Sequence, residues 1–238
     1  MRIGSLEIGN GWPMRIIAEI GTLHIHQGLK GMLKITEEAF KHGADLVKTQ
    51  LINSETTWWA TREQRERYRS FYDYMFLDKW TEYLKICNRD FGPTFSSVFD
   101  ESYVRLFDAL VPAWKIGYKA TFMPSLVQTV LETRKPVILS ITNLEQRAKL
   151  VPPKFRESSL FLYVQPHYPT NSEQFLLPDL RLYDGISLHS NDPKFAEAAF
   201  VFNPKLIEIH IQGEGANGPD TSFALTLPQL SELKSMVT

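Results

Sequence analysis

The sequence is poor in three features: cysteine, long apolar runs and an excess of charge of one sign. Its single cysteine, Cys87, lies in an apolar stretch and has no second cysteine to pair with, which excludes an internal disulfide. No run of about 18 apolar residues occurs, so a membrane-spanning helix is not expected. The first residues, Met-Arg-Ile-Gly-Ser-Leu-Glu, lack the apolar core of a secretory signal. These absences predict a soluble, cytoplasmic chain.

The charges are nearly balanced, with 26 Lys and Arg residues against 27 Asp and Glu residues. Duplex nucleic acid and anionic membranes attract proteins through a broad positive field, so the balance argues against either partner. Any anionic ligand must therefore meet a local cluster of cations. A chain of 238 residues, 43% of them hydrophobic, is long enough for one large core, and a single domain is expected.

Short β-branched apolar runs recur along the chain and mostly alternate with stretches of helical periodicity, a pattern typical of a parallel sheet. We count eight runs, at residues 15–20, 45–48, 94–97, 113–116, 137–140, 160–164, 185–188 and 206–211. Eight strands with covering helices predict an α/β fold, a single-domain (β/α)8 TIM barrel over residues 1–238. A doubly wound open sheet is the alternative with the same spacing.

The segment at about residues 53–78, between the second predicted strand and the next helix, is longer than an ordinary connection. Its aromatic residues, set among many charges, are Trp58, Trp59, Tyr68, Phe71, Tyr72, Tyr74 and Phe76. Such an insertion covers the barrel mouth, meets another subunit, or forms a helix that buries its aromatic side chains locally.

Polar residues end most of the apolar runs, and the carboxyl ends of barrel strands are where catalytic groups lie. Lys48 and Lys115 lie within such runs, where a buried ammonium group requires an anion. Together with serine hydroxyls at strand ends, two inward lysines form a phosphate or carboxylate site. The alternative is that each lysine pairs with a buried Glu or Asp at the barrel rim.

His189 and His210 end two adjacent predicted strands, which brings two imidazoles within reach of one ion. A two-histidine site leaves coordination positions open for substrate oxygens and water. Either histidine alone would be interpreted as a hydrogen-bonded residue of the rim. The pairing is what predicts a Lewis-acid metal ion.

Several motifs, in order along the chain, resemble those of the sialic acid (N-acetylneuraminate) synthase family. Residues 16–24, Ile-Ile-Ala-Glu-Ile-Gly-Thr-Leu-His, resemble the family's Ile-Ile-Ala-Glu-Ile-Gly-x-Asn-His. Residues 43–50, Gly-Ala-Asp-Leu-Val-Lys-Thr-Gln, fit its Gly-Ala-Asp-x-Val-Lys-x-Gln. Further matches lie at residues 112–117, 135–140, 168–169, 187–189, 207–210 and 218–220. Because the order is kept over nearly the whole chain, the chain is identified as a member of this family.

The resemblance implies an enzyme that condenses phosphoenolpyruvate with an amino-sugar aldehyde, similar to N-acetylmannosamine, to give a nonulosonic acid and phosphate. It implies that His189 and His210 hold a divalent metal ion, Mn²⁺ with Mg²⁺ or Co²⁺ as alternatives. Lys48 and Lys115 would bind phosphoenolpyruvate, with Glu19 beside the reacting carbons. The other expected substrate contacts are Ser97, Ser140 and Ser187 for phosphoenolpyruvate, and Gln50, Tyr168 and Asp220 for the sugar.

Some positions depart from the family pattern. Leu23 replaces an Asn, Leu188 replaces the Asp before the first metal histidine, and residues 117–120, Gly-Tyr-Lys-Ala, replace a stretch with Ser-Gly-Glu. The chain also ends after the eighth predicted helix, without the family's antifreeze-like C-terminal domain, which reaches across a homodimer to the sugar. We expect a homodimer whose acceptor is another sugar, or whose mouth is capped by a separate polypeptide or by the insertion.

These departures leave two other functions open. One is a catalytically impaired barrel that binds ligand or metal as a regulatory or assembly subunit. The other is a metal-dependent aldolase that uses a different enol donor.

Overall fold

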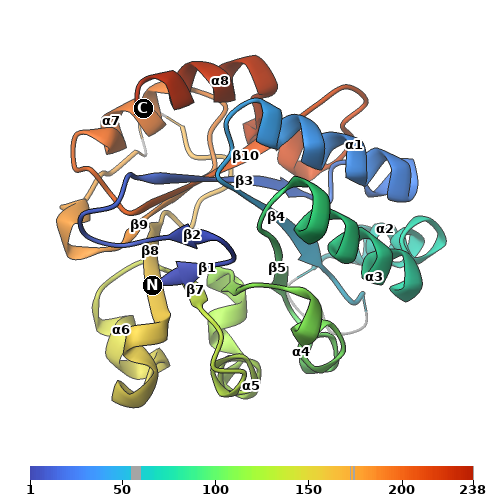
Figure 1. The fold of residues 1–238 in the computed structure, drawn as a ribbon, viewed down its shortest axis with the longest axis horizontal. Helices are drawn as coiled ribbons and strands as arrows, with labels where there is room; N and C mark the ends of the chain where they lie inside the picture. Colours follow the sequence, from blue (N-terminus) through green and yellow to red (C-terminus); the bar gives the residue numbers. More distant parts are fainter. Residues whose placement is uncertain (55–59, 172, 174, 238) are drawn as a thin grey trace.

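A computed structural model of the chain describes residues 1–54, 60–171, 173 and 175–237, with the backbone alone at residues 72 and 73. Its centre is a ring of parallel strands, and the helices lie around the outside of that ring (Figure 1). The first and last strands of the ring, β3 (Arg15–Gly21) and β10 (Leu206–Gln212), pair with each other, with Glu19 opposite His210. This pairing closes the sheet into a barrel.

Within the described residues, eight parallel strands follow one another around the barrel in chain order. Between β3 and β10 they are β4 (Leu46–Leu51), β5 (Thr94–Val98), β6 (Trp114–Ile116), β7 (Val137–Ile141), β8 (Ser159–Val164) and β9 (Gly185–Leu188). Each of the predicted apolar runs overlaps one of these strands, although β4 continues three residues beyond the predicted end at residue 48. The single (β/α)8 barrel is therefore confirmed, and the open sheet is wrong because β10 pairs with both β9 and β3.

The helices that cover the strands are α1 (Gly28–Lys41), α2 (Arg62–Tyr74), α3 (Leu77–Ile86), α4 (Glu101–Phe107), α5 (Pro124–Glu132), α6 (Glu145–Leu150), α7 (Lys194–Phe200) and α8 (Leu227–Ser235). Local signals in the sequence set several helix starts. Pro124 occupies the first turn of α5, and Thr226 caps α8 in a reciprocal arrangement with Gln229. No helix in the described part of the chain combines the length and apolar composition needed to span a bilayer.

A short antiparallel hairpin, β1 (Arg2–Ile3) and β2 (Leu6–Glu7), lies across the end of the barrel at which the strands begin (Figure 1). Its Gly4 approaches Pro93 and Pro112, which precede β5 and β6. The hairpin was not predicted from the sequence, because two strands of two residues carry no periodic pattern. It leaves the opposite end of the barrel for the functional site.

Two aspartates, buried Asp184 and half-buried Asp45, fasten the amino-terminal ends of the strands. Asp45, just before β4, accepts hydrogen bonds from the Ile16 backbone N–H at 2.9 Å and from Lys234 Nζ at 2.7 Å, and pairs with Arg15 at 3.2 Å. Asp184, just before β9, likewise accepts from a backbone N–H at 2.8 Å and from a lysine ammonium at 2.6 Å. Both carboxylates have every partner that a structural role requires.

The predicted insertion at 53–78 contains α2, which begins at a capping box formed by Thr61 and Gln64. Its aromatic residues divide between burial and exposure. Phe71 is buried, Tyr68 is partly buried, and the side chain of Phe76 is 51% exposed. Trp58, Trp59 and the side chain of Tyr72 lie outside the described residues.

Candidate functional site

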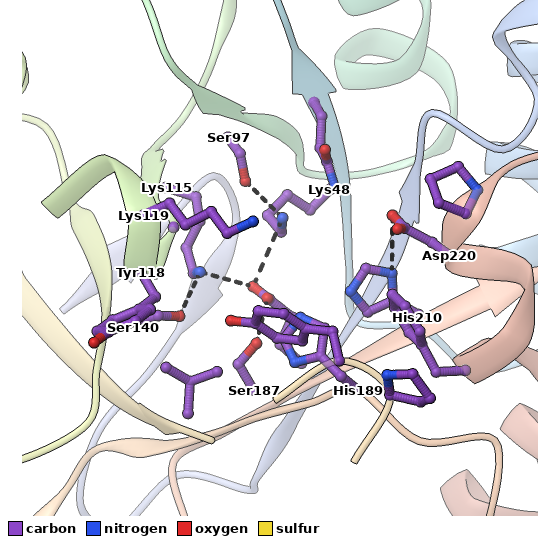
Figure 2. A pocket seen from close by; sticks show the side chains of 18 of the residues that line it. Lys48, Ser97, Lys115, Tyr118, Lys119, Ser140, Ser187, His189, His210 and Asp220 are labelled. Carbon is purple, nitrogen blue, oxygen red and sulfur yellow. Dashed lines mark hydrogen bonds and ion pairs between the residues drawn. The ribbon is translucent and has the colours of Figure 1, made fainter. Parts of the chain in front are cut away.

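A cavity of about 380 Å³ opens where the barrel strands end. Most residues that line it come from the last residues of a strand or from the loop after it, as the fold predicts. Of the eleven residues predicted for the site, ten line this cavity: Lys48, Gln50, Ser97, Lys115, Ser140, Tyr168, Ser187, His189, His210 and Asp220. Figure 2 shows the lysines and the two histidines on opposite sides of it.

Two lysine and serine pairs form the inner end of the cavity. Lys48 Nζ donates a hydrogen bond to Ser97 Oγ at 2.7 Å, and Lys115 Nζ donates to Ser140 Oγ at 2.7 Å. Both lysine side chains are almost fully buried, at 3% and 2% exposed. The four residues of the two pairs come one each from four consecutive barrel strands, β4 to β7, so the barrel itself sets their spacing. The two pairs present ammonium and hydroxyl donors to one small volume (Figure 2).

Buried carboxylates accompany these lysines. Glu208 Oε2 lies 3.5 Å from Lys115 Nζ and 3.9 Å from Lys48 Nζ, while Glu208 Oε1 accepts a hydrogen bond from Ser187 at 2.7 Å. Glu19 pairs with Lys48. The alternative prediction, that the lysines pair with buried carboxylates, therefore also holds. Pairing with these carboxylates is compatible with a site for an anionic ligand, because the same ammonium groups also face the cavity.

The electrostatics of this cluster are dominated by burial. Burial, which disfavours a charged group, lowers the pKa of Lys48 to about 7 against the attraction of Glu208, and it also lowers the pKa of Lys115. For Glu208, burial acts in the opposite sense, but the ammonium groups of Lys115 and Lys48 outweigh it and lower its pKa to about 2. The cluster thus holds charges that are poorly solvated, and an incoming anion would interact with them strongly.

Glu19 is the one predicted residue that does not line the cavity. It is fully buried and pairs with Lys48, which does line the cavity. Gly21 adopts a positive φ of 50°, and a Cβ there would lie 3.2 Å from Glu19 Oε1 and 3.3 Å from Asp220 Oδ2. A glycine at this bulge lets the two carboxyl groups approach the backbone closely. The place of Glu19 beside reacting carbons stays a prediction.

His189 and His210 lie side by side, with ring centroids 4.8 Å apart. Burial holds the pKa of both imidazoles well below the usual range, and the His210 ring lowers that of His189 further. The Nδ1 atom of each ring is buried and has no hydrogen-bond partner. Phe223 and Tyr168 pack against the pair, with the Tyr168 ring centroid 4.0 Å from that of His189. Both histidines are therefore neutral, the form that binds a metal ion.

The donors near the two histidines decide whether the predicted metal ion fits. The described residues contain no group of three or more His, Cys, Asp and Glu side chains placed to hold a metal. Asp220 Oδ2 lies 3.7 Å from His210 Nδ1, and its pKa is raised to about 6, chiefly by burial. Two neutral imidazoles with unbonded buried nitrogens nevertheless fit a site whose other ligands are water and substrate oxygens. His189 and His210 could hold a divalent ion there.

The outer part of the cavity is formed by residues that the sequence analysis did not assign to the site. We call Gln64 and Tyr68 of α2, together with Tyr118 and Lys119 of the short helix η4 (Tyr118–Phe122), the outer wall. Arg67 Nη2 donates a hydrogen bond to the Asn217 carbonyl oxygen at 2.5 Å and so joins α2 to the loop after β10. The spacing of Gln64 and Tyr68 places them on one helix face, but it does not say what that face meets.

Comparison with known proteins identifies the family of this chain. The model of the NeuB family matches residues 35–238, most of the chain. The chain belongs to the NeuB family. This confirms the resemblance found in the sequence motifs, and it agrees with a barrel whose strand ends carry the matched residues.

Three proteins illustrate what this NeuB-family chain is similar to. The uncharacterized protein MJ1065 of Methanocaldococcus jannaschii is 29% identical over 194 residues, which cover 78% of this chain and only 56% of that protein. N-acetylneuraminic acid (sialic acid) synthetase of Leptospira borgpetersenii superposes with a TM-score of 0.87 at 20% identity, over 100% of this chain and 87% of that chain. Spore coat polysaccharide biosynthesis protein SpsE of Bacillus subtilis gives 0.76 at 21% identity, over 100% and 70%. At these identities the solved structures support the fold alone.

Proposed function

We propose that this NeuB-family barrel condenses phosphoenolpyruvate with an amino-sugar aldehyde of the N-acetylmannosamine type, giving a nonulosonic acid and phosphate. One observation carries the proposal: two lysine and serine pairs and two neutral imidazoles line the same cavity at the carboxyl end of the barrel. Family membership and the fold shared with a protein named as a sialic acid synthetase support the same reaction type.

Phosphoenolpyruvate suits the inner end of the cavity because it carries a phosphate and a carboxylate on a short carbon frame. Lys48 with Ser97 and Lys115 with Ser140 supply ammonium and hydroxyl donors for these groups. The desolvated lysines bind an anion more strongly than exposed ones would. Glu208, held between the lysines and Ser187, keeps the ammonium groups in place before substrate arrives.

The aldehyde of the sugar would lie toward the histidines, with Tyr168, Gln50 and Asp220 beside it. His189 and His210 would hold a divalent ion, manganese by preference, and a bound ion would supply Lewis-acid chemistry at a carbonyl oxygen. The aromatic rings of Tyr168 and Phe223 pack against the imidazoles and help to fix their orientation.

The reaction balances as follows. The methylene carbon of phosphoenolpyruvate forms a bond to the aldehyde carbon, and the aldehyde oxygen takes up a proton. Water adds to the central carbon, and one of its protons replaces the one taken up by the aldehyde oxygen. The bond between the central carbon and the phosphate oxygen then breaks, the carbon becomes a carbonyl, and the second proton of water goes to the departing phosphate. Glu19 is the buried carboxylate nearest Lys48. It serves either to accept a proton from water or to stabilise the cationic carbon.

The test is an incubation of the protein with phosphoenolpyruvate, Mn²⁺ and a panel of N-acetylated hexosamines, in which released phosphate and the new sugar acid are measured together. We expect equal amounts of both products and no product without metal. Lys115→Met serves as the inactive control. Absence of phosphate release with every sugar would contradict the proposal, and turnover with pyruvate in place of phosphoenolpyruvate would favour the aldolase alternative.

A further inference from the structure

The cavity contains three lysines, and the three differ in how their charge is balanced. Lys48 pairs with Glu19 and lies 3.9 Å from Glu208, and Lys115 lies 3.5 Å from Glu208. Lys119 also lines the cavity, but among the described residues no carboxylate oxygen lies within 4.0 Å of its ammonium group. The inner end therefore has carboxylates for both of its lysines, and the outer wall carries a positive charge of its own.

The placement of Lys119 is more specific than that of an ordinary surface lysine. Lys119 is an exposed residue at the rim, in η4 directly after β6, so its side chain could point into solvent. Figure 2 instead shows the side chain of Lys119 extending into the cavity that it lines. In this position its ammonium group can meet an anion that enters from the rim. Lys119 is one of the cations that lower the pKa of Asp220 against the effect of burial, but the two side chains lie beyond ion-pair distance.

The other members of the outer wall are neutral and can form hydrogen bonds. Gln64 offers an amide, and Tyr68 and Tyr118 offer hydroxyl groups. Burial raises the pKa of Tyr68 to about 12, so its hydroxyl stays protonated and can donate. These groups suit the hydroxyl and amide groups of a sugar. Within the outer wall, Lys119 is the residue with a charged side chain.

We propose that the acceptor sugar carries an anionic group, a phosphate ester or a carboxylate, at the end remote from its aldehyde, and that Lys119 binds this group. The inference rests on the proposed function, because it concerns the acceptor of that reaction. The aldehyde must reach the methylene carbon of phosphoenolpyruvate at the inner end, so the remote end of the sugar faces the rim. Lys119 is thus a specificity-determining residue for the second substrate.

Binding tests this inference without turnover. The protein is saturated with phosphoenolpyruvate in the presence of EDTA, so that the inner lysines are occupied, and three sugars are titrated by calorimetry: N-acetylmannosamine, its 6-phosphate and N-acetylmannosaminuronic acid. A charge-assisted hydrogen bond predicts that an anionic sugar binds about tenfold more tightly than the neutral one, or better. The phosphate and carboxylate arms identify which anion is preferred. Equal affinity for all three sugars overturns the inference.

Variants then assign the effect to Lys119. We expect Lys119→Gln to reduce the preference for the anionic sugar to less than about threefold, and Lys119→Arg to retain it, because arginine keeps the charge. The matched control is Lys154→Gln, which removes an exposed lysine just before β8, at the other end of the barrel. A preference that survives in Lys119→Gln, or that is lost equally in Lys154→Gln, contradicts the assignment.

A turnover assay separates this inference from the proposed function. With Mn²⁺ added, consumption of phosphoenolpyruvate is followed with the neutral and the anionic sugars. If no sugar supports consumption, the proposed function fails, while the affinity comparison still decides the charge of the ligand. If the neutral sugar alone is consumed, the proposed function stands and the inference about Lys119 is wrong.

Discussion

Carboxylates with little solvent exposure lie at both ends of the barrel, and the two ends differ in how completely the carboxylate oxygens are bonded. At the amino ends of the strands, Asp45 and Asp184 accept hydrogen bonds from backbone N–H groups and lysine ammonium groups. At the carboxyl ends, Glu19 Oε1 and Glu208 Oε2 are buried without a hydrogen-bond partner. The same chemical group therefore fastens the fold at one end and stays incompletely bonded at the other, where a ligand is expected.

The difference shows how a closed barrel separates stability from activity. Unsatisfied buried polar groups are unfavourable, and a protein that retains several in one place has another use for them. Here most of those in the described residues belong to the cavity or to the Glu19 carboxylate beside it, and they include the unbonded Nδ1 atoms of His189 and His210. Variants at the two ends should consequently affect different measurements.

The largest effect is expected from Lys115→Met. It removes one of the two ammonium groups at the inner end and leaves Glu208 with less compensation. We expect kcat/KM for phosphoenolpyruvate to fall by about a hundredfold or more, as for the truncation of one partner in a buried charge pair. Lys154→Met is the control for the loss of a lysine. Wild-type kinetics in Lys115→Met would contradict the idea that the carboxyl end of the barrel serves activity while the amino end serves stability.

A nearly equal effect is expected from His210→Gln on metal affinity. The variant leaves one imidazole, so Mn²⁺ affinity measured by calorimetry should fall by about a hundredfold. His167→Gln, on the exposed loop after β8, changes the same residue type outside the cavity and should leave Mn²⁺ affinity unaltered. Equal Mn²⁺ affinity in wild type and His210→Gln would show that the imidazole pair does not bind the ion.

At the opposite end, Asp45→Asn should destabilise the protein and spare ligand binding. The side chain of Asp45 is only 10% exposed and pairs with both Arg15 and Lys234. We expect the free energy of unfolding in urea to fall by about 2 kcal/mol. Affinity for phosphoenolpyruvate should change by less than about twofold, because distant sites act independently. Asp90→Asn, on the exposed surface, should alter stability by less than about 0.5 kcal/mol.

The smallest effect concerns pH. Lys48 must be protonated to attract an anion, and burial lowers its pKa to about 7. As the pH rises above 7, the protonated fraction in the free protein falls, so affinity for phosphoenolpyruvate should weaken by about tenfold between about pH 7 and about pH 8.5. Lys48→Arg stays charged over this range and should bind with little pH dependence. A wild-type affinity that is constant over this range contradicts the prediction.

The sequence predicts one side of the site far better than the other, for a physical reason. Lys48, Lys115 and His210 lie on barrel strands, and the fold brings the carboxyl ends of all strands to one place. Their apolar neighbours in sequence also mark them as unusual. Glu208 could have been added by the same reasoning, because it lies two residues before His210 and so shares its face of β10.

The outer wall could not be derived in this way. Gln64 and Tyr68 belong to a charged helix whose polar pattern is equally typical of a face exposed to solvent and of one that lines a cavity. The sequence around Lys119 does not distinguish it from an ordinary exposed lysine. Their position depends on how loops after different strands pack, for instance through the hydrogen bond from Arg67 to the Asn217 carbonyl. Such contacts join residues far apart along the chain and leave no local pattern.

The pairing of β3 with β10 also has a consequence for biosynthesis. The first barrel strand to be synthesised, β3, cannot pair on one side until the last, β10, has been made. Glu19 and His210 come opposite each other only when β10 is in place. A growing chain that stops short of β10 has two open sheet edges, and it lacks both Glu208 and His210. Closure of the ring and assembly of the cavity are therefore a single late event, so partly translated barrels can neither bind the substrates properly nor protect their edges from association.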